Sequence, residues 1–247
     1  MRKQNIIGIV LFCGFLFSIA AGFLMPKSDF SVMEKRYLAE APVFHVKTVF
    51  SGDWSTQVED YLVDHIPGRN LFVGLHAYLE RLAGRQRLTD VWQEKGKLLE
   101  APVDADRKTI DRNMHAINTF ANGLGQQVHL MVVPSAGWAA GVEGYTDDAA
   151  IAAIYDAAEE NVRAVSVEDL FSGRPDLYYN TDHHWTSQGA YDAYAGFMEL
   201  LGREYRHAED FQVTVAEGFQ GSTYSRSALW MTPAESIELW QGSDCLT

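Results

Sequence analysis

Cysteine and basic charge are both scarce in this chain of 247 residues. Its two cysteines, Cys13 and Cys245, lie near opposite ends of the sequence, so no intrachain disulfide is expected. Lysine and arginine together number 20 against 33 aspartates and glutamates, which gives a net charge of −13. Because an acidic surface repels the phosphates of nucleic acid and of anionic lipid, the charge argues against both as partners.

The sequence also lacks internal repeats, low-complexity tracts and glycine-rich phosphate loops. Without such a loop it carries no signature of a nucleotide site, and we expect no cofactor. A chain of this length, 47% of it hydrophobic, is sufficient for one sizeable domain or for one domain with a stalk.

One long apolar run is present, from Ile6 to Met25, and a basic N-terminus precedes it. Twenty helical residues span about 30 Å, the thickness of a bilayer core. The run therefore predicts a retained single-pass membrane anchor with residues 27–247 outside the cytoplasm. A cleaved signal peptide ending near Ala21 is the alternative, and it would leave the protein secreted.

The remaining chain predicts an α/β layered fold. Helical periodicity indicates helices at about 54–64, 70–83, 105–124, 148–160 and 187–201. A hairpin is expected around 91–99, and continuous apolar runs at 128–133 and 163–167 are typical of buried parallel strands. Alternating strands and helices favour a mostly parallel sheet.

The division expected from these patterns is a cytoplasmic tip and membrane anchor over 1–26, an irregular stalk over 27–53 and the folded domain over 54–247. Only two or three core strands are recognisable, whereas an open α/β sheet usually has about five or more. Either the sheet is small or the domain continues beyond residue 247.

The most informative string is Asp182-His183-His184-Trp185. It directly precedes the last of the predicted helices, which Thr186 or Ser187 can cap. Asp182 and His184 are therefore expected on a turn at the positive end of a helix, which favours an ionised Asp182. There Asp182 could accept a hydrogen bond from one imidazole nitrogen of His184, leaving the other nitrogen to act as base towards a serine.

Two other interpretations of this string stay open. An aspartate near a histidine is often only a surface or capping contact. Metal ligation would require both imidazoles to reach one ion, which side-by-side residues rarely achieve.

Several strings together resemble the DHHW protein family, which is related to the SGNH-hydrolase-like domains of alginate O-acetylation proteins. They are 34–38 (EKRYL), 61–69 (YLVDHIPGR), 132–136 (VVPSA), the DHHW turn at 182–185, and 221–227 (GSTYSRS). The resemblance implies an SGNH-hydrolase-like α/β domain at the cell envelope. The related acetylation proteins move an acetyl group onto a polysaccharide hydroxyl with a Ser-His-Asp triad.

Carried over residue by residue, the resemblance makes Asp182 the orienting acid and His184 the general base, with Trp185 packing the turn. In the relatives the nucleophilic serine follows this pair by many tens of residues, on a turn after a late apolar strand. The sequence ends 63 residues after His184 without such a string, so the domain is expected to be incomplete at its C-terminus.

The nucleophile expected from the resemblance could therefore lie beyond residue 247, and two serines within the chain are alternatives. Ser135 follows the strand at 128–133, where α/β enzymes often place functional groups, but a plain strand exit is equally compatible. Ser222 lies in a Gly-Ser-Thr-Tyr-Ser loop, where a structural or substrate-loop role competes with nucleophilic attack.

Four further residues have both structural and functional interpretations. His65 and Arg69 suit a loop that ends a helix, and Arg69 could instead buttress the site or bind a carboxylate-bearing glycan. Trp138 and Trp230 could stack on sugar rings or pack in the core.

The leading functional prediction is an extracytoplasmic O-acyltransferase or esterase acting on envelope polysaccharide, with a membrane-bound O-acyltransferase as a possible acyl-donor partner. The alternative is a non-catalytic envelope protein that binds glycan or such a partner.

Overall fold

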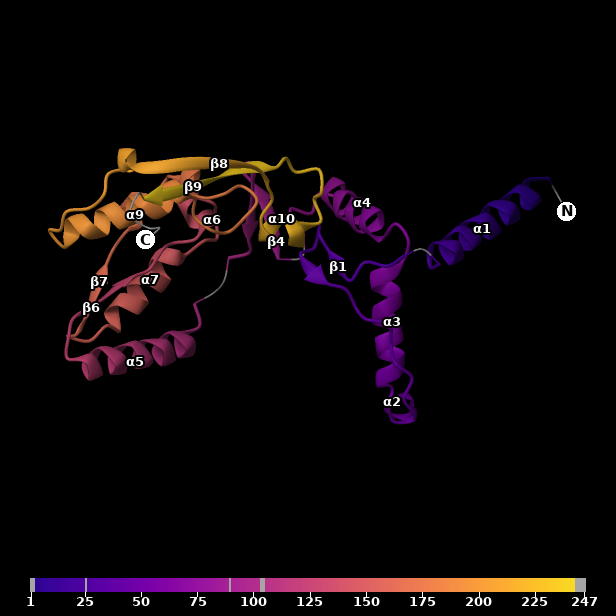
Figure 1. Cartoon of the computed structure of the whole chain (residues 1–247), viewed down its shortest axis with the longest axis horizontal. Helices are drawn as coiled ribbons and strands as arrows, with labels where there is room; N and C mark the ends of the chain where they lie inside the picture. Colours follow the sequence, from indigo (N-terminus) through magenta and orange to yellow (C-terminus); the bar gives the residue numbers. More distant parts are fainter. Residues whose placement is uncertain (1–2, 25, 89, 103–104, 243–247) are drawn as a thin grey trace. The chain divides into compact units, whose positions relative to one another are not determined.

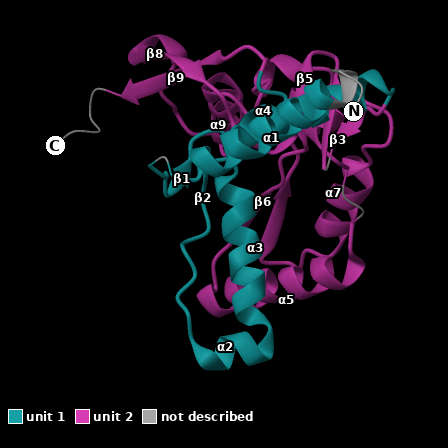
Figure 2. Cartoon of the chain, turned by 90° about the vertical axis from the view of Figure 1, so that its right-hand side faces the viewer, with its two compact units in different colours: residues 1–84, 228–230 teal, residues 85–227, 231–247 magenta. Residues whose placement is uncertain are grey.

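The computed structural model describes residues 3–24, 26–88, 90–102 and 105–242 (Figure 1). The chain divides into two compact units, coloured in Figure 2. Unit 1 comprises residues 1–84 and 228–230, and unit 2 comprises 85–227 and 231–247. Cys245 lies outside the described residues, so the expectation that the chain has no intrachain disulfide is not tested. The domain boundary predicted at residue 54 stays a prediction.

The described part of unit 1 is helical apart from one short antiparallel hairpin. Its elements are α1 (Lys3–Gly22), β1 (Phe30–Ser31), β2 (Arg36–Tyr37), α2 (Val46–Ser51), α3 (Asp53–His65) and α4 (Arg69–Leu82). Helices α3 and α4 confirm the two helices predicted there. The stalk expected to be irregular instead contains β1, β2 and α2, because the backbone from 29 to 38 folds back on itself through a Ser31–Glu34 turn.

Helix α1 forms over most of the apolar run, and the side chains of its described part are largely exposed, Phe17 by 76%. Within the described ranges, however, no helix is both long and apolar enough to cross a membrane. The transmembrane helix predicted at Ile6–Met25 is therefore not supported, and Met25 itself lies outside those ranges.

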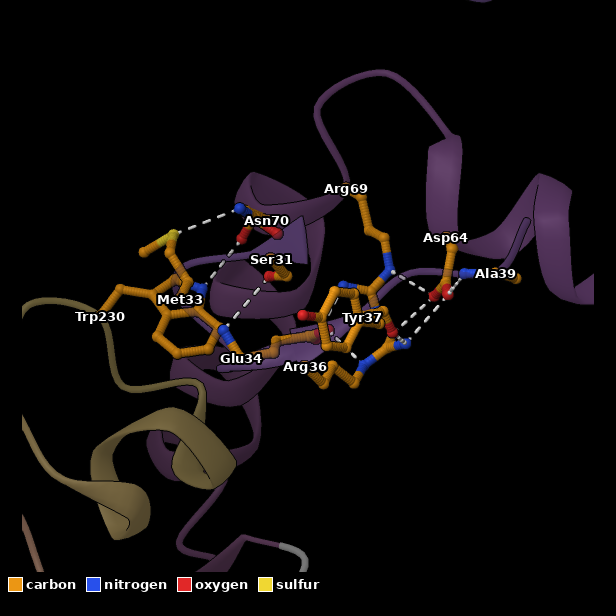
Figure 3. Close-up of polar contacts among 10 residues, drawn as sticks. All are labelled: Ser31, Met33, Glu34, Arg36, Tyr37, Ala39, Asp64, Arg69, Asn70 and Trp230. Carbon is orange, nitrogen blue, oxygen red and sulfur yellow. Dashed lines mark hydrogen bonds and ion pairs between the residues drawn. The ribbon is translucent and has the colours of Figure 1, made fainter. Parts of the chain in front are cut away.

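Two strings that carried the family resemblance pair with each other in unit 1 (Figure 3). Arg36 from the first string forms a two-pronged ion pair with Asp64 from the second, at 2.5 and 2.9 Å. Arg69 Nη1 lies 2.7 Å from Glu34 Oε1. The hydrogen bonds from Arg36, against the opposing effect of burial, hold the pKa of Asp64 at about 2. These charges therefore neutralise one another and fasten the hairpin to the α3–α4 corner.

Unit 2 contains the remaining described strands, which form separate small sheets. They are β3 (Arg87–Leu88), β4 (Val91–Glu94), β5 (Lys97–Glu100), β6 (Val128–Met131), β7 (Val162–Val165), β8 (Phe211–Phe219) and β9 (Glu235–Gly242). Antiparallel pairing joins β3–β4–β5 and β8–β9, whereas β6 and β7 are parallel.

The mixed α/β class is confirmed, but the prediction of a mostly parallel sheet is wrong. Only the β6–β7 pair, connected through α6 (Ala136–Ala139) and α7 (Asp147–Asp156), is parallel among the described strands. Short connections such as the two-residue turn Lys95-Gly96, with both residues at positive φ, can join only antiparallel neighbours.

The helices of unit 2 cover its sheets and position the loops of the site. They are α5 (Arg107–Leu124), α6 (Ala136–Ala139), α7 (Asp147–Asp156), α8 (Glu168–Phe171), η1 (Pro175–Leu177), α9 (Ser187–Leu200), η2 (Ala208–Asp210) and α10 (Ser222–Ser227). The main buried cluster collects side chains from β5, α6, α8, η1 and α9, with Phe171, Leu177, Ala139 and Ala193 fully enclosed. This cluster lies directly beneath the DHHW turn, since Trp185 packs against it.

The predicted helices are present, but their buried faces are not made of apolar residues alone. In α5, Ile110, Met114 and Ala121 are buried, whereas the apolar Phe120 is 61% exposed. The polar Asn118 is buried because its amide bonds Ala157 O and Glu159 N, which joins α5 to the loop after α7. A polar residue can thus take a core position when tertiary contacts satisfy it.

Candidate functional site

The DHHW string forms the tip of a tight hairpin between η1 and α9. Tyr178 and Trp185 make an isolated antiparallel bridge, and Tyr179 N donates to His184 O at 3.2 Å. Thr186 ends the hairpin and caps α9, because its Oγ1 accepts a hydrogen bond from Gly189 N at 3.2 Å. Of the two capping residues that the sequence offered, Thr186 and Ser187, the structure uses Thr186, and Asp182 and His184 lie on a turn as expected.

Asp182 is held by hydrogen bonds on both carboxylate oxygens. Its Oδ1 lies 2.5 Å from His184 Nδ1 and accepts from His184 N at 3.0 Å, while Oδ2 accepts from Ser222 N at 2.6 Å. The side chain is only 9% exposed. Burial acts to raise the pKa of Asp182, but the hydrogen bonds from Ser222 and His184 outweigh it and lower the pKa to about 2. Asp182 is therefore an ionised acceptor at neutral pH.

His184 is oriented by this carboxylate but remains open to solvent, with 66% of its side chain exposed. When Nδ1 donates to Asp182, the lone pair of Nε2 is available, and Nε2 has no hydrogen-bond partner among the residues that the structure describes. The imidazole borders a cavity of about 910 Å³. An oriented imidazole with one free nitrogen beside a cavity has the arrangement of a general base.

His183 faces a different set of partners. Its ring lies 3.9 Å from that of His184, measured between centroids, and its Nδ1 is 3.0 Å from Ser222 Oγ. Glu100 Oε1 lies 3.5 Å from the same nitrogen, and Glu100 is itself paired with Arg226. The structure therefore brings Ser222 to the DHHW turn, but its hydroxyl contacts His183 rather than His184.

Ser135, the other serine considered, lies at the N-terminus of α6 and also borders the cavity. Its Oγ accepts a hydrogen bond from Trp138 N at 3.3 Å, and its own N–H donates to Asp147 Oδ1 at 2.7 Å. Ser135 thus acts as a helix cap, which agrees with the plain strand-exit interpretation.

The prediction that Ser222 lies in a loop is wrong, because Ser222 is the first residue of helix α10. The close approach of Gly221 to the DHHW turn holds Asp182 against Ser222. Gly221 lies so near Asp182 that an added Cβ would come within 2.6 Å of Thr181 O and inside the van der Waals radii of Asp182 Cβ and Oδ2. Glycine is therefore required here for space, which places the N–H of Ser222 on the carboxylate.

Two ionic groups that the sequence did not single out, the buried Lys97 and the partly buried Glu235, clamp the hairpin. Lys97 Nζ donates to Tyr178 O at 2.7 Å, Tyr179 O at 3.3 Å and Asn180 Oδ1 at 2.8 Å. Glu235 accepts from the N–H groups of the next residues, Asn180 and Thr181, at 2.8 and 2.7 Å. Burial lowers the pKa of Lys97, although nearby Glu235 opposes this. The one available signal was a lysine inside an apolar strand, Lys97-Leu98-Leu99.

Replacing Lys97 with methionine is expected to lower the free energy of unfolding by about 2–4 kcal/mol, because buried carbonyl groups would lose their donor. Lys108→Met on α5 is the matched control, since the Lys108 side chain is exposed, and it should cost less than about 1 kcal/mol. Denaturant unfolding of both variants measures the difference. Equal effects would show that the clamp does not stabilise the hairpin.

The three residues Asp182, His183 and His184 also bring potential metal ligands within 4.8 Å of one another. Two ligands of a tetrahedral zinc ion, each about 2.0–2.1 Å from the metal, would lie roughly 3.3 Å apart. Asp182 Oδ1 and His184 Nδ1 are 2.5 Å apart, which is the distance of a charge-assisted hydrogen bond. As placed, the cluster fits a hydrogen-bonded Asp–His pair better than a metal centre.

The remaining candidate residues take structural positions. His65 is buried, stacks on Tyr61 and places Nδ1 2.9 Å from Tyr61 O. Arg69 pairs with Glu34, and Trp230 Nε1 donates to Asn70 O at 3.1 Å, all within unit 1. In unit 2, Trp138 packs against the core cluster. The structural interpretation holds for each.

The hairpin, helix α9 and the residues Gly221 and Ser222 lie inside one segment that has relatives. Residues 137–235 match the model of the DHHW protein family. The matched segment contains Asp182, His184, Ser222 and, as its last residue, Glu235. Lys97, Ser135 and the α5 wall of the cavity lie outside it.

Solved structures show the same fold in longer proteins. A DHHW family protein from Eubacterium siraeum aligns with a TM-score of 0.53 and 23% identity, over 62% of this chain and 54% of that one. PatB1 from Bacillus cereus aligns with a TM-score of 0.50 and 18% identity, over 62% and 59%. This chain thus spans somewhat more than half the length of these relatives. None of the curated proteins compared with the chain matches it.

Proposed function

We propose that this protein transfers or hydrolyses acyl esters of cell-envelope polysaccharide through a serine ester intermediate. The observation that carries the proposal is the Asp182–His184 pair, with an ionised carboxylate 2.5 Å from Nδ1 and an exposed imidazole beside a cavity. The DHHW family match and the fold shared with PatB1 support it. A partner protein, such as a membrane-bound acyltransferase, would deliver the acyl group.

Ser222 is the nucleophile that we assign within the described residues. Its Oγ would attack the ester carbonyl, forming a new C–O bond while its proton passes to an imidazole, and that proton would then leave with the departing alcohol. A polysaccharide hydroxyl or water would release the acyl group by the reverse steps. Ser222 Oγ now contacts His183, and the ring of His184 lies 3.9 Å from the ring of His183, tilted by 36°. Because Asp182 Oδ1 lies 2.5 Å from His184 Nδ1 but 3.7 Å from His183 Nδ1, we assign the base to His184.

Covalent labelling tests this assignment. Treatment of the full chain with a small sulfonyl fluoride should modify Ser222, detected by peptide mass spectrometry, and should abolish turnover of a chromogenic acetyl ester. Ser222→Ala should lose both labelling and turnover, whereas Ser135→Ala should keep them. Turnover that survives in Ser222→Ala would remove this serine from the mechanism.

A non-catalytic protein that binds envelope glycan is the second candidate. It is favoured by one observation, namely that Ser222 Oγ bonds His183 and not the His184 imidazole that Asp182 orients. Under this alternative the wild-type chain would show no ester turnover and no labelling, while still binding polysaccharide fragments.

Export from the cytoplasm is the localisation that we propose. The basic N-terminus followed by the apolar run has the order of a targeting segment, whether retained or cleaved. In cells, residues 27–247 should be degraded by protease added from outside the cytoplasmic membrane. N-terminal sequencing of the mature protein then decides between the two forms, because a chain beginning near Ala21 has lost the segment. Protection from the external protease would contradict export.

A further inference from the structure

The cavity beside the DHHW turn has a volume of about 910 Å³ and a largely apolar wall. One face of α7 supplies Ala150, Ile151 and Ile154, which follow one another at helical spacing. Ile110 from α5 and Val132 and Val133 after β6 complete this wall. Ile110 and Ile151 are 9% and 2% exposed, so the wall is built into the core of unit 2.

The charged groups around the cavity do not offer a site for an anion. Among the described residues that border it there is no lysine or arginine, and the carboxylates are those of Glu100, Asp106 and Asp147. Each carboxylate already has a partner: Glu100 pairs with Arg226, Asp106 caps α5, and Asp147 accepts from Ser135 N. A ligand bearing negative charge would be repelled, whereas a neutral apolar chain would meet mainly the hydrocarbon of this wall.

The size of the cavity discriminates between acyl groups. Pockets of about 300–1,000 Å³ enclose ligands of the size of a small drug molecule. A two-carbon acetyl group would contact only a small part of such a wall and would leave the rest without a partner.

We propose that this cavity takes a neutral, straight acyl chain longer than acetyl, with its carbonyl end at His184. The proposal rests on the proposed function for the chemistry at that end. The apolar wall formed by α5, α7 and the exit of β6 carries the preference for a longer chain.

Binding of uncleavable acyl amides measures the chain-length preference without turnover. Calorimetry on the full chain would use acetamide, butanamide, hexanamide and octanamide as probes. Each buried methylene should lower Kd about fourfold, so octanamide should bind at least about a hundredfold more tightly than butanamide. Equal affinity for these two amides would overturn the proposal.

Two phenylalanine substitutions on α7 locate the binding. Ala150→Phe fills the cavity and should weaken octanamide binding at least tenfold. Ala152→Phe adds the same ring two residues away, where α7 is exposed, and should leave the binding unchanged. Comparable losses in both variants, or no loss in either, would show that octanamide does not occupy this cavity.

The enzymatic activity and the preference for a long acyl chain can be refuted separately. If octanamide and butanamide bind equally well while the acetyl ester is still turned over, the long acyl chain is refuted and the enzyme is retained. Strong chain-length dependence without turnover of any ester, from two to eight carbons, would refute the enzyme and retain a site for apolar chains.

Discussion

Replacement of His184 by alanine is expected to lower kcat/KM for a chromogenic acyl ester by about 10²–10⁴, the usual contribution of a positioned general base. Asp182→Asn should give a loss of the same order, because an amide cannot hold the imidazole in the tautomer that leaves Nε2 unprotonated. Both proposed roles require the 2.5 Å hydrogen bond between Asp182 Oδ1 and His184 Nδ1. Combining the two substitutions should cost little more than either alone, since the two groups act as a unit.

The matched control for His184 is His115→Ala, because His115 is an exposed histidine on α5 that does not border the cavity. Its turnover should equal that of the unmodified protein. Steady-state kinetics over a range of pH provides the measurement. If His184→Ala kept more than about a tenth of the activity while remaining folded, His184 would not be the base.

Ionisation of Asp182 also makes the stability of the fold depend on pH. Its pKa in the folded chain is about 2, below the unfolded value of about 3.9. The carboxylate therefore contributes about 2 kcal/mol of stability that is complete above about pH 4 and lost as the pH falls towards 2. Asp182→Asn should flatten this part of the acid-unfolding curve, and an unchanged curve would show that the carboxylate is not stabilised as described.

Gly221→Ala is expected to disrupt the site although the change is one methyl group. The added Cβ would lie 2.6 Å from Thr181 O and overlap Asp182, so the two loops would have to separate. Overpacking of this kind costs about 1–3 kcal/mol. The N–H of Ser222 would also leave Asp182 Oδ2, and a displacement of about 1 Å at a catalytic group lowers activity about a hundredfold.

Gly196→Ala serves as the control for Gly221. Gly196 lies within α9, and its added Cβ meets no atom within 4 Å. Because alanine favours the helix over glycine, this variant should be more stable by about 0.5–1 kcal/mol. Thermal unfolding and ester turnover of both variants provide the comparison. Unchanged turnover in Gly221→Ala would mean that the loops do not approach as closely as described.

Local patterns in the sequence were sufficient for the longer helices α3, α4, α5, α7 and α9 and for the Asp–His pair, but not for the short helices α2, α6, α8 and α10. Thr186 caps α9 through a hydrogen bond that spans three residues, and Asp182 reaches His184 across two. Interactions over such short distances along the chain need only a turn or one helical repeat, so their residue types and spacing predict them.

The sheet topology and the buried helix faces could not be predicted in the same way. The short strands β6 and β7 led to the prediction of a larger parallel sheet. The longest strands, β8 and β9, instead form an antiparallel hairpin that is largely exposed. In α5 the choice between burying Phe120 and burying Asn118 depended on partners in the loop after α7. Secondary-structure propensity and hydrophobic periodicity carry no information about partners that lie far away in the sequence.

By itself, the sequence determined the longer helices, the hairpin turn at Lys95-Gly96 and the position of Asp182 and His184 on a capped turn, because each depends on residues close together in the chain. Only the tertiary structure decided that Ser222 contacts His183, that Lys97 and Glu235 clamp the hairpin, and that an apolar cavity borders His184. These contacts join residues 39 to 83 positions apart. Burial of the surrounding core brings such residues together, and that burial is a property of the whole packed unit rather than of any local string.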